Sequence, residues 1–221
     1  DYGWDLRKKD PTAKESPLEL LKALDQVEGL KWIRLLYLYP DGITQEMIEV
    51  IKNSKKIAKY FDMPLQHINN NVLKNMNRKM TREEILRALS LIRSEIPEAV
   101  IRTQFIVGFP GETEENFEEL LEFIADQKFD RVGCFQYSPE ENTPGGKMPD
   151  QIDETTKQRR FEAVMEVQQN ISREKHKAFI GKTLEVVVEG LSDETDLLLQ
   201  GRSSQQAPDV DGVVLINDGQ A

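Results

Sequence analysis

Four groups of polar, aromatic or glycine residues stand where strands are predicted to end, and these are the positions where the sequence could do chemistry. In parallel α/β sheets and barrels, ligands bind beside the carboxyl ends of the strands. We therefore expect a ligand site built from these turns. The four groups are Tyr39–Pro40, Pro64–His67, Gly108–Glu112 and Tyr137–Glu140.

The second group offers two polar side chains directly after an apolar segment. The amide of Gln66 donates and accepts at once, which suits a ribose or an amide, although a loop amide can also bond to its own backbone. His67 is as consistent with an ordinary loop histidine as with a functional one. The residue types alone leave both alternatives open.

The third and fourth groups, and Arg102 in the strand before the third, each allow a ligand contact and an ordinary structural role. Gly108 and Gly111 flank Phe109 and would let the backbone approach a ligand, but any tight strand-to-helix turn would also use them. Arg102, inside a strand, needs an anion, which is either a ligand carboxylate or a neighbouring Glu. Tyr137 could stack on an adenine or fill space at the strand ends.

Arg78 closes a short predicted helix, and its guanidinium could either meet an anion or cap that helix. Cys134 is the single cysteine, and we expect a small buried residue on a strand. One cysteine excludes an internal disulfide and an all-cysteine metal site from this chain, and it fits a reducing compartment. Walker motifs, Ser/His/Asp arrangements and metal-ligand clusters do not occur in the sequence.

The elements that must position these groups alternate between strands and helices, with short turns between them. This alternation predicts an α/β fold in which a parallel sheet has helices outside. Apolar spacing and cap residues predict the helices, and a Thr81–Glu84 capping box marks the start of one of them. Strands are predicted at 32–39, 60–63, 101–107 and 131–137, and helices at 17–24, 46–51, 71–76, 82–96, 114–124 and 154–179.

The pattern changes after Gly181, where strands predicted at 184–188 and 213–216 indicate a small all-β module. Residues 181–221 carry eight acidic and two basic side chains, within a net charge of −10 for the whole chain. Such a surface repels phosphates, so direct nucleic-acid binding is not expected and a basic protein partner suits the module better. Long apolar runs and a signal-peptide pattern are missing, so we expect no membrane association and a cytoplasmic protein.

Taken together and in order, the motifs resemble those of the radical-SAM methylthiotransferase family. The resemblance runs along nearly the whole chain. It implies a partial (β/α) radical-SAM barrel over residues 1–179 and an incomplete TRAM-like β module over 180–221. The matching strings are Tyr2–Leu6, Trp32–Pro40, Pro64–His67, Met76–Arg78, Arg102–Thr103 with Ile106–Thr113, Phe135–Glu140, Gly201–Arg202 and Ala207–Gly212.

Within that family the chain looks most similar to the RimO branch, which modifies the β-carbon of an aspartate in ribosomal protein S-twelve. The residues that favour this branch are Gln66–His67 and Glu140–Glu141, together with the acidic tail. One alternative is a tRNA methylthiotransferase acting on a modified adenosine, and binding tRNA would require phosphate neutralisation. Another is a non-catalytic fragment that binds the ribosome or RNA.

The resemblance also implies cofactors and partners. These are S-adenosylmethionine (SAM), two four-iron four-sulfur clusters, an electron donor, and the small ribosomal subunit with protein S-twelve. In the family, a cluster held by a CxxxCxxC motif reduces SAM to a 5′-deoxyadenosyl radical, which takes hydrogen from an unactivated C–H bond. By motif match, Gln66, Arg102, Gly108, Phe109 and Tyr137 would line the SAM side of the barrel. The cluster cysteines are missing here, so we expect these 221 residues alone to be inactive.

Overall fold

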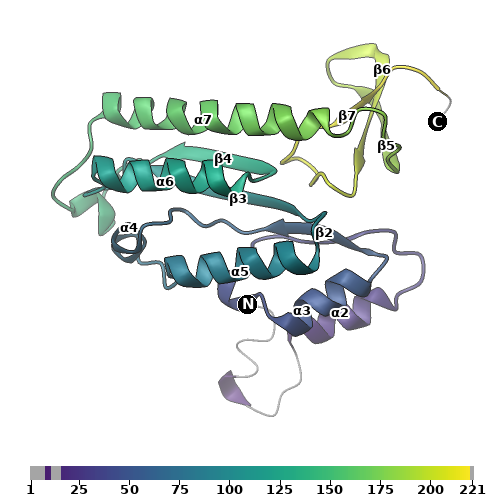
Figure 1. Ribbon diagram of the computed structural model, residues 1–221, viewed down its shortest axis with the longest axis horizontal. Coiled ribbons are helices and arrows are strands. Elements are labelled where there is room, and N and C mark those ends of the chain that lie inside the picture. Colours follow the sequence, from purple (N-terminus) through teal and green to yellow (C-terminus); the bar gives the residue numbers. More distant parts are fainter. Residues whose placement is uncertain (1–7, 11–15, 220–221) are drawn as a thin grey trace.

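The computed structural model describes residues 8–10 and 16–219, so the Tyr2–Leu6 match lies outside the described part of the chain. Its first domain alternates between strands and helices as the sequence predicts (Figure 1). The strands are β1 (Ile33–Leu35), β2 (Ile57–Asp62), β3 (Val100–Val107) and β4 (Arg131–Gln136). The helices are α2 (Pro17–Asp25), α3 (Gln45–Asn53), α4 (Asn70–Asn75), α5 (Arg82–Glu95), α6 (Glu114–Gln127) and α7 (Glu154–Lys177), with 3-10 turns η1 (Pro40–Gly42) and η2 (Gly145–Lys147).

The four strands form one parallel sheet in the order β1-β2-β3-β4, so sequence order and spatial order agree. Their carboxyl ends therefore meet at one edge, where the β2–α4, β3–α6 and β4–α7 connections gather. The predicted α/β class is confirmed. Figure 1 shows α5, α6 and α7 running along the sheet, with the second domain at the amino end of the strands.

Local capping explains where the main helices begin. The hydroxyl of Thr81 accepts from the N–H of Glu84, whose carboxylate accepts in turn from the N–H of Thr81, and this is the predicted capping box. Thr113 and Asn116 form the same reciprocal pair at the start of α6. Asp153 caps α7 through the N–H of Thr156. These caps fix the direction in which each helix leaves the strand ends.

Alternation along β3 decides which side of the sheet is the core. Ile101, Thr103, Phe105 and Val107 are buried, whereas the residues between them are half-buried. The buried set faces the helices, where apolar side chains of the strands and of α3, α5, α6 and α7 form one continuous core. The opposite, concave face carries polar and aromatic residues and is only partly covered.

The first predicted strand is much shorter than expected. The apolar run 32–39 pairs as a strand only over Ile33–Leu35. Beyond it, Tyr37 adopts a left-handed φ of 58° and donates its N–H to the carboxylate of Asp62, while Leu38 donates to the Asp62 carbonyl. The carboxylate of Asp62 at the end of β2 thus accepts from Tyr37, while its backbone carbonyl accepts from Leu38, and the regular strand pairing ends before both.

The C-terminal domain is an antiparallel sheet of β5 (Val186–Ser192), β6 (Thr195–Ser203) and β7 (Val214–Ile216) in that order. The first and last strands correspond to the predicted ones. The sequence prediction missed β6, because its apolar and polar residues do not alternate strictly and polar turns flank it. In the described ranges 8–10 and 16–219, no helix is long and apolar enough to span a membrane.

Candidate functional site

Gln66, one of the predicted site residues, lies just beyond the carboxyl end of β2 and pairs with β3. Gln66 forms an isolated parallel bridge to Phe105: its N–H donates to the Gln104 carbonyl at 2.8 Å and its carbonyl accepts from Ile106 at 2.9 Å. Its left-handed φ of 68° turns the chain there. The side-chain amide is mostly buried and lies 3.4 Å from the Pro64 carbonyl. The backbone of Gln66 thus extends the sheet by one more pairing.

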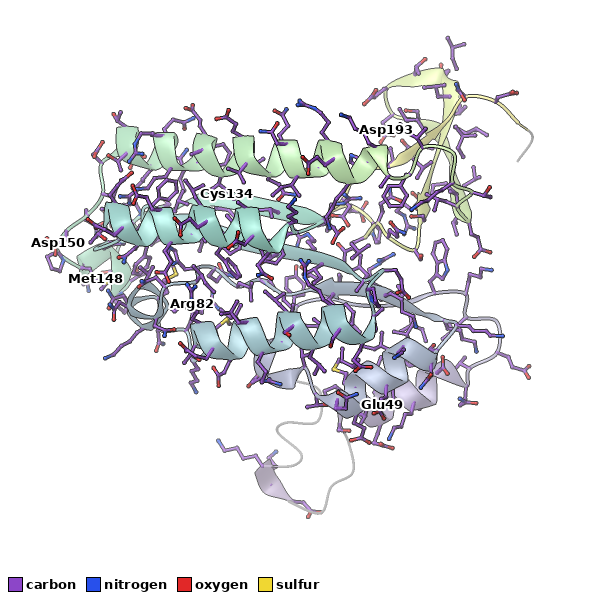
Figure 2. All side chains as sticks on the ribbon, in the orientation of Figure 1. Glu49, Arg82, Cys134, Met148, Asp150 and Asp193 are labelled. Carbon is purple, nitrogen blue, oxygen red and sulfur yellow. The ribbon has the colours of Figure 1, made fainter. Side chains whose placement is uncertain are left out.

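Phe109 and Tyr137 come together as an aromatic pair at the same end. Their ring centroids are 4.8 Å apart in an edge-to-face arrangement. The ring of Tyr137 also lies 5.9 Å from the ammonium of Lys157, and its hydroxyl approaches Gly145 of η2. Figure 2 shows the labelled Met148 and Asp150 of this loop at the opposite end of the molecule from Asp193.

Gly108 is needed for a reason other than an approaching ligand. Its φ is +74°, and a Cβ placed there would overlap the side chain of the buried Lys157. Gly111 also has a positive φ of 80°, and its N–H donates to the Asp150 carbonyl at 3.0 Å. The two glycines therefore let the β3–α6 turn pack against α7 and the β4–α7 loop.

Beneath this turn lies a buried cluster of charged and polar side chains, in which His67 and Glu112 meet Arg160, a residue that the sequence analysis did not single out. Glu112 is fully buried and accepts from the Gly108 N–H and from Arg160 Nη1, the latter at 3.0 Å. Its other oxygen faces Nε2 of the fully buried His67 at 3.3 Å. Because Nδ1 of His67 accepts from the Asn69 N–H, the ring proton belongs on Nε2, which donates to Glu112.

This cluster joins three connections that are far apart in sequence. His67 follows β2, Glu112 follows β3, and Arg160 belongs to α7, where its Nη1 also donates to the Glu112 carbonyl at 3.1 Å. A buried charge needs such partners, because leaving one unpaired costs several kcal/mol. The acidic end of Gly108–Glu112 was a usable signal, because a Glu inside a tight turn and so close to a glycine often serves the backbone.

Arg102 lies apart from the aromatic pair. Its Nη1 donates to Asp62 Oδ1 at 2.7 Å, and its Nε is 3.9 Å from Asp211 Oδ1. The side chain lies on the concave face but near the start of β3, well before Gly108. Among the described residues, the anions beside Arg102 are therefore the side chains of Asp62 and Asp211.

Arg78 instead reaches the carboxyl ends. Its Nη1 donates to the hydroxyl of Tyr39 at 3.2 Å, whereas its backbone N–H bonds back to Leu73. The guanidinium is partly exposed, and no carboxylate pairs with it within the part of the chain that the structure describes. Large apolar side chains are also exposed around these strand ends, including Leu36, Tyr37 and Phe135.

At the amino ends of the strands, the second domain closes against the sheet. Asp211, nearly buried, accepts from the hydroxyl of Tyr60 at 2.6 Å and lies 3.9 Å from the Nε atoms of Arg102 and Arg131. Burial raises the pKa of the Tyr60 phenol, and the Asp211 carboxylate raises it further. Arg34 stacks over the Tyr60 ring and donates to the Ser204 carbonyl. We call Asp211, Tyr60 and the three arginines around them, Arg34, Arg102 and Arg131, the Asp211 clasp.

Cys134 lies on the helix-facing side of β4, as predicted for a small buried residue, and Figure 2 shows it between the sheet and the long helices. Burial raises the pKa of its thiol to about 12. Iron–sulfur clusters are held by several cysteine thiolates. Residues 8–10 and 16–219 hold no group of acidic, His or Cys side chains arranged for a metal, so the residues present do not fit a cluster. The edge-to-face pair of Phe109 and Tyr137 does offer an aromatic surface that fits the base of a nucleoside.

Comparison with known families decides how this arrangement is classified. The sequence model described as the Radical SAM superfamily matches residues 9–124, more than half of the chain. The chain belongs to the radical SAM superfamily. A TRAM domain model matches residues 180–221. The predicted partial radical-SAM barrel with a C-terminal TRAM-like module is thus confirmed. The parallel sheet belongs to the first and the antiparallel sheet to the second.

Curated relatives place this radical SAM chain beside the RimO proteins, as the motif resemblance indicates. It is 78% identical over all 221 residues to "Ribosomal protein uS12 methylthiotransferase RimO" of Bdellovibrio bacteriovorus, and it covers 48% of that protein. It is 50% identical over 91% of its length to the protein of the same name from Geobacter sulfurreducens, covering 45% of it. The chain spans about half the length of the curated relatives it matches.

A solved structure supports the fold independently. The radical SAM chain resembles coproporphyrinogen III oxidase (HemN) from Escherichia coli, described as a radical SAM enzyme, with a TM-score of 0.50 over 74% of this chain and 38% of the other. The two are only 21% identical, so the likeness concerns the fold alone.

Proposed function

We propose that this chain forms the substrate-facing part of a radical SAM methylthiotransferase that modifies ribosomal protein uS12 at the β-carbon of an aspartate. The observation that carries the proposal is the 78% identity, over the full length of the chain, to a RimO protein named for that substrate. The acidic C-terminal domain agrees with a basic ribosomal protein. It argues against tRNA, whose binding requires neutralised phosphates.

In this proposal SAM binds at the carboxyl ends of β2, β3 and β4, beside Gln66, Gly108, Phe109 and Tyr137. Together with a reduced iron–sulfur cluster held elsewhere in the whole protein, SAM would supply the radical chemistry needed at an unactivated C–H bond. The aromatic pair offers an adenine a flat apolar contact, and the polar groups of Gln66 suit a ribose. Glu112 holds the turn that carries Phe109 in place.

The site predicted from the sequence also includes Arg102, which we propose to be less directly involved with the ligand than Arg78. Its guanidinium is held by Asp62 on the concave face, so it would act on a ligand only from deeper in the barrel. Arg78 is better placed to meet a carboxylate at the strand ends, because among the described residues its guanidinium bonds to the neutral hydroxyl of Tyr39 and to no carboxylate. Exchanging each arginine for Gln in turn separates the two roles.

We further propose that the cluster ligands come from a segment joined to this chain, because the 221 residues hold a single, buried cysteine. The chain alone is then inactive, and the number of clusters in the whole protein is two. The domains are proposed as 1–179 and 180–221. The end of α7 at Lys177 and the start of β5 at Val186 support this boundary. Cytoplasmic location follows from a ribosomal target.

Mass spectrometry of uS12 tests the proposal. In cells lacking the gene for the full-length protein, the uS12 aspartate should lack its methylthio group, and restoring the gene should return it. A methylthio group that remains on uS12 after deletion would sink the proposal. Loss of a methylthio nucleoside from tRNA instead would point to the tRNA branch, and the nucleoside profile should be recorded from the same cells.

A further inference from the structure

A cleft of about 650 Å³ runs between α7, the start of β4 and the loop at Val210–Gly212, away from the carboxyl-end site. Its volume is in the range of ligand sites in proteins. The apolar part of its wall comes from Val132, Phe161, Met165 and Val210, of which Met165 is 38% and Val210 49% exposed. Such exposed apolar residues in a concave surface are typical of an interaction site.

The cleft opens onto an unpaired strand edge. Within the described residues β4 pairs only with β3, so its other edge is the end of the sheet. The part of β4 that lines the cleft is Arg131–Gly133. An exposed edge accepts an added strand, because its backbone N–H and C=O groups can bond to an extended peptide. An extended segment is therefore the shape that this cleft suits.

The charges of the cleft leave an excess of acceptors. Its two arginines face Asp62 and Asp211, and Asp130 pairs with Lys175 at 2.6 Å. Glu162 and Glu166 stand one turn apart on α7, and neither forms an ion pair in the described structure. Like charges at this spacing weaken a helix slightly, so a cationic partner would relieve them.

A buried amide adds a second, independent sign of a missing donor. Gln168 lines the cleft with only 5% of its surface exposed. Its Nε2 donates to the Phe129 carbonyl at 3.1 Å, but its Oε1 is buried without a hydrogen-bond partner. An unmatched buried acceptor costs about 1–3 kcal/mol, and a lysine or arginine side chain entering the cleft would supply the donor.

We propose that this cleft binds an extended, basic segment of the protein substrate, with backbone pairing along β4 and a cationic side chain directed toward Glu166 and Gln168. The inference rests on the proposed function, because it takes that substrate to be uS12. It assigns α7 the task of holding the substrate, which leaves the strand ends free for the reacting residue.

Charge reversal tests the proposal in the full-length protein with purified uS12 as the probe. The Glu162→Lys, Glu166→Lys double variant should raise the dissociation constant for uS12 by about tenfold or more. A matched control is Glu118→Lys with Glu122→Lys, the same change at the same spacing on the exposed face of α6. The control should change the constant less than about threefold. Circular dichroism establishes that both variants fold.

Gln168→Leu removes the orphan acceptor without changing charge, but it also removes the donor to the Phe129 carbonyl. It should weaken uS12 binding, and circular dichroism establishes that this variant also folds. A photo-reactive residue at position 165 should cross-link to uS12. Equal affinities for the two double variants, or cross-linking only within the protein's own chain, would overturn the docking site. If the docking site fails but wild-type protein still modifies uS12, the proposed function stands. If wild-type protein neither binds nor modifies uS12, the proposed function is wrong as well.

Discussion

The two ends of the β1–β4 sheet use buried charge for different purposes. At the carboxyl end, Glu112, His67 and Arg160 belong to one domain and fix a turn that presents Phe109. At the amino end, the Asp211 clasp joins two domains through Tyr60, with its partners 151 residues apart. The difference agrees with the general rule for parallel barrels, in which the carboxyl end carries function and the amino end carries stability.

The largest effect should come from removing the charge at the carboxyl end. Glu112→Ala leaves the Gly108 N–H without its acceptor. It also takes the one buried carboxylate from Arg160, which keeps only the backbone carbonyl of residue 112 and the half-exposed Glu114. We therefore expect a loss of about 3–5 kcal/mol in the free energy of unfolding. Chemical denaturation measures it. Glu118→Ala on exposed α6 is the control and should cost less than about 0.5 kcal/mol. A loss below about 1 kcal/mol for Glu112→Ala would mean that the buried cluster does not hold the turn.

The second largest effect should come from breaking the Asp211 clasp, which holds the two domains together. Asp211→Ala removes the acceptor of the Tyr60 hydroxyl and the acidic neighbour of two arginines, at a cost of about 2–3 kcal/mol. Tyr60→Phe and the double variant complete a cycle, and the coupling should be about 1 kcal/mol or more. Proteolysis between the domains should become faster in Asp211→Ala. Additive effects of the two substitutions would contradict a direct bond.

A smaller effect is expected from a single methyl group at the β3–α6 turn. Gly108→Ala forces a positive φ on a residue with a Cβ and pushes against Lys157, so we expect a loss of about 1–2 kcal/mol. Combining it with Lys157→Ala removes the overlap but not the backbone strain. Unfolding of the double variant should therefore show partial recovery relative to the sum of the single changes. A fully neutral Gly108→Ala would show that the turn adapts.

The smallest effect concerns Cys134, which takes no part at either end. Because burial raises the pKa of its thiol to about 12, only about one molecule in ten thousand carries the thiolate at pH 8. Cys134 is the single cysteine of the sequence, so alkylation of the chain reports on it alone. Alkylation of the folded chain should be far slower than alkylation in denaturant. The rate should rise with pH toward 12 as long as the fold persists. Rapid alkylation at pH 8 would contradict the burial of this strand face.

Much of the fold can be predicted from local sequence, whereas contacts between residues far apart in the sequence cannot. The Thr81 and Thr113 caps and the alternation of β3 involve residues three or fewer positions apart, so a sequence states them directly. The shortening of β1 depends on Asp62, which lies 25 residues after Tyr37. Chain-local patterns carry no information about such a partner, so the full strand 32–39 was predicted.

The site shows the same division. Phe109 and Tyr137 were selected because each follows a strand, and the topology does bring their rings together. The buried partnership of Glu112 with Arg160 joins positions 48 apart. The turn around Glu112 suggests that its carboxylate serves the backbone, but the sequence near either residue does not identify the other as its partner. Arg102 was correctly expected to need an anion. Its partners among the described residues come from β2 and from the second domain, which only the fold places beside it.

Affinity for SAM tests the contrast between the two ends most directly. Full-length protein carrying its cluster should bind SAM about tenfold more weakly after Tyr137→Leu, because a base contact at the carboxyl end is lost. Asp211→Ala at the amino end should change that affinity by less than about twofold, because it acts on domain association. Equilibrium dialysis measures both. Unchanged binding in Tyr137→Leu, or a tenfold loss in Asp211→Ala, would contradict the assignment of the cofactor site to the carboxyl ends of the strands.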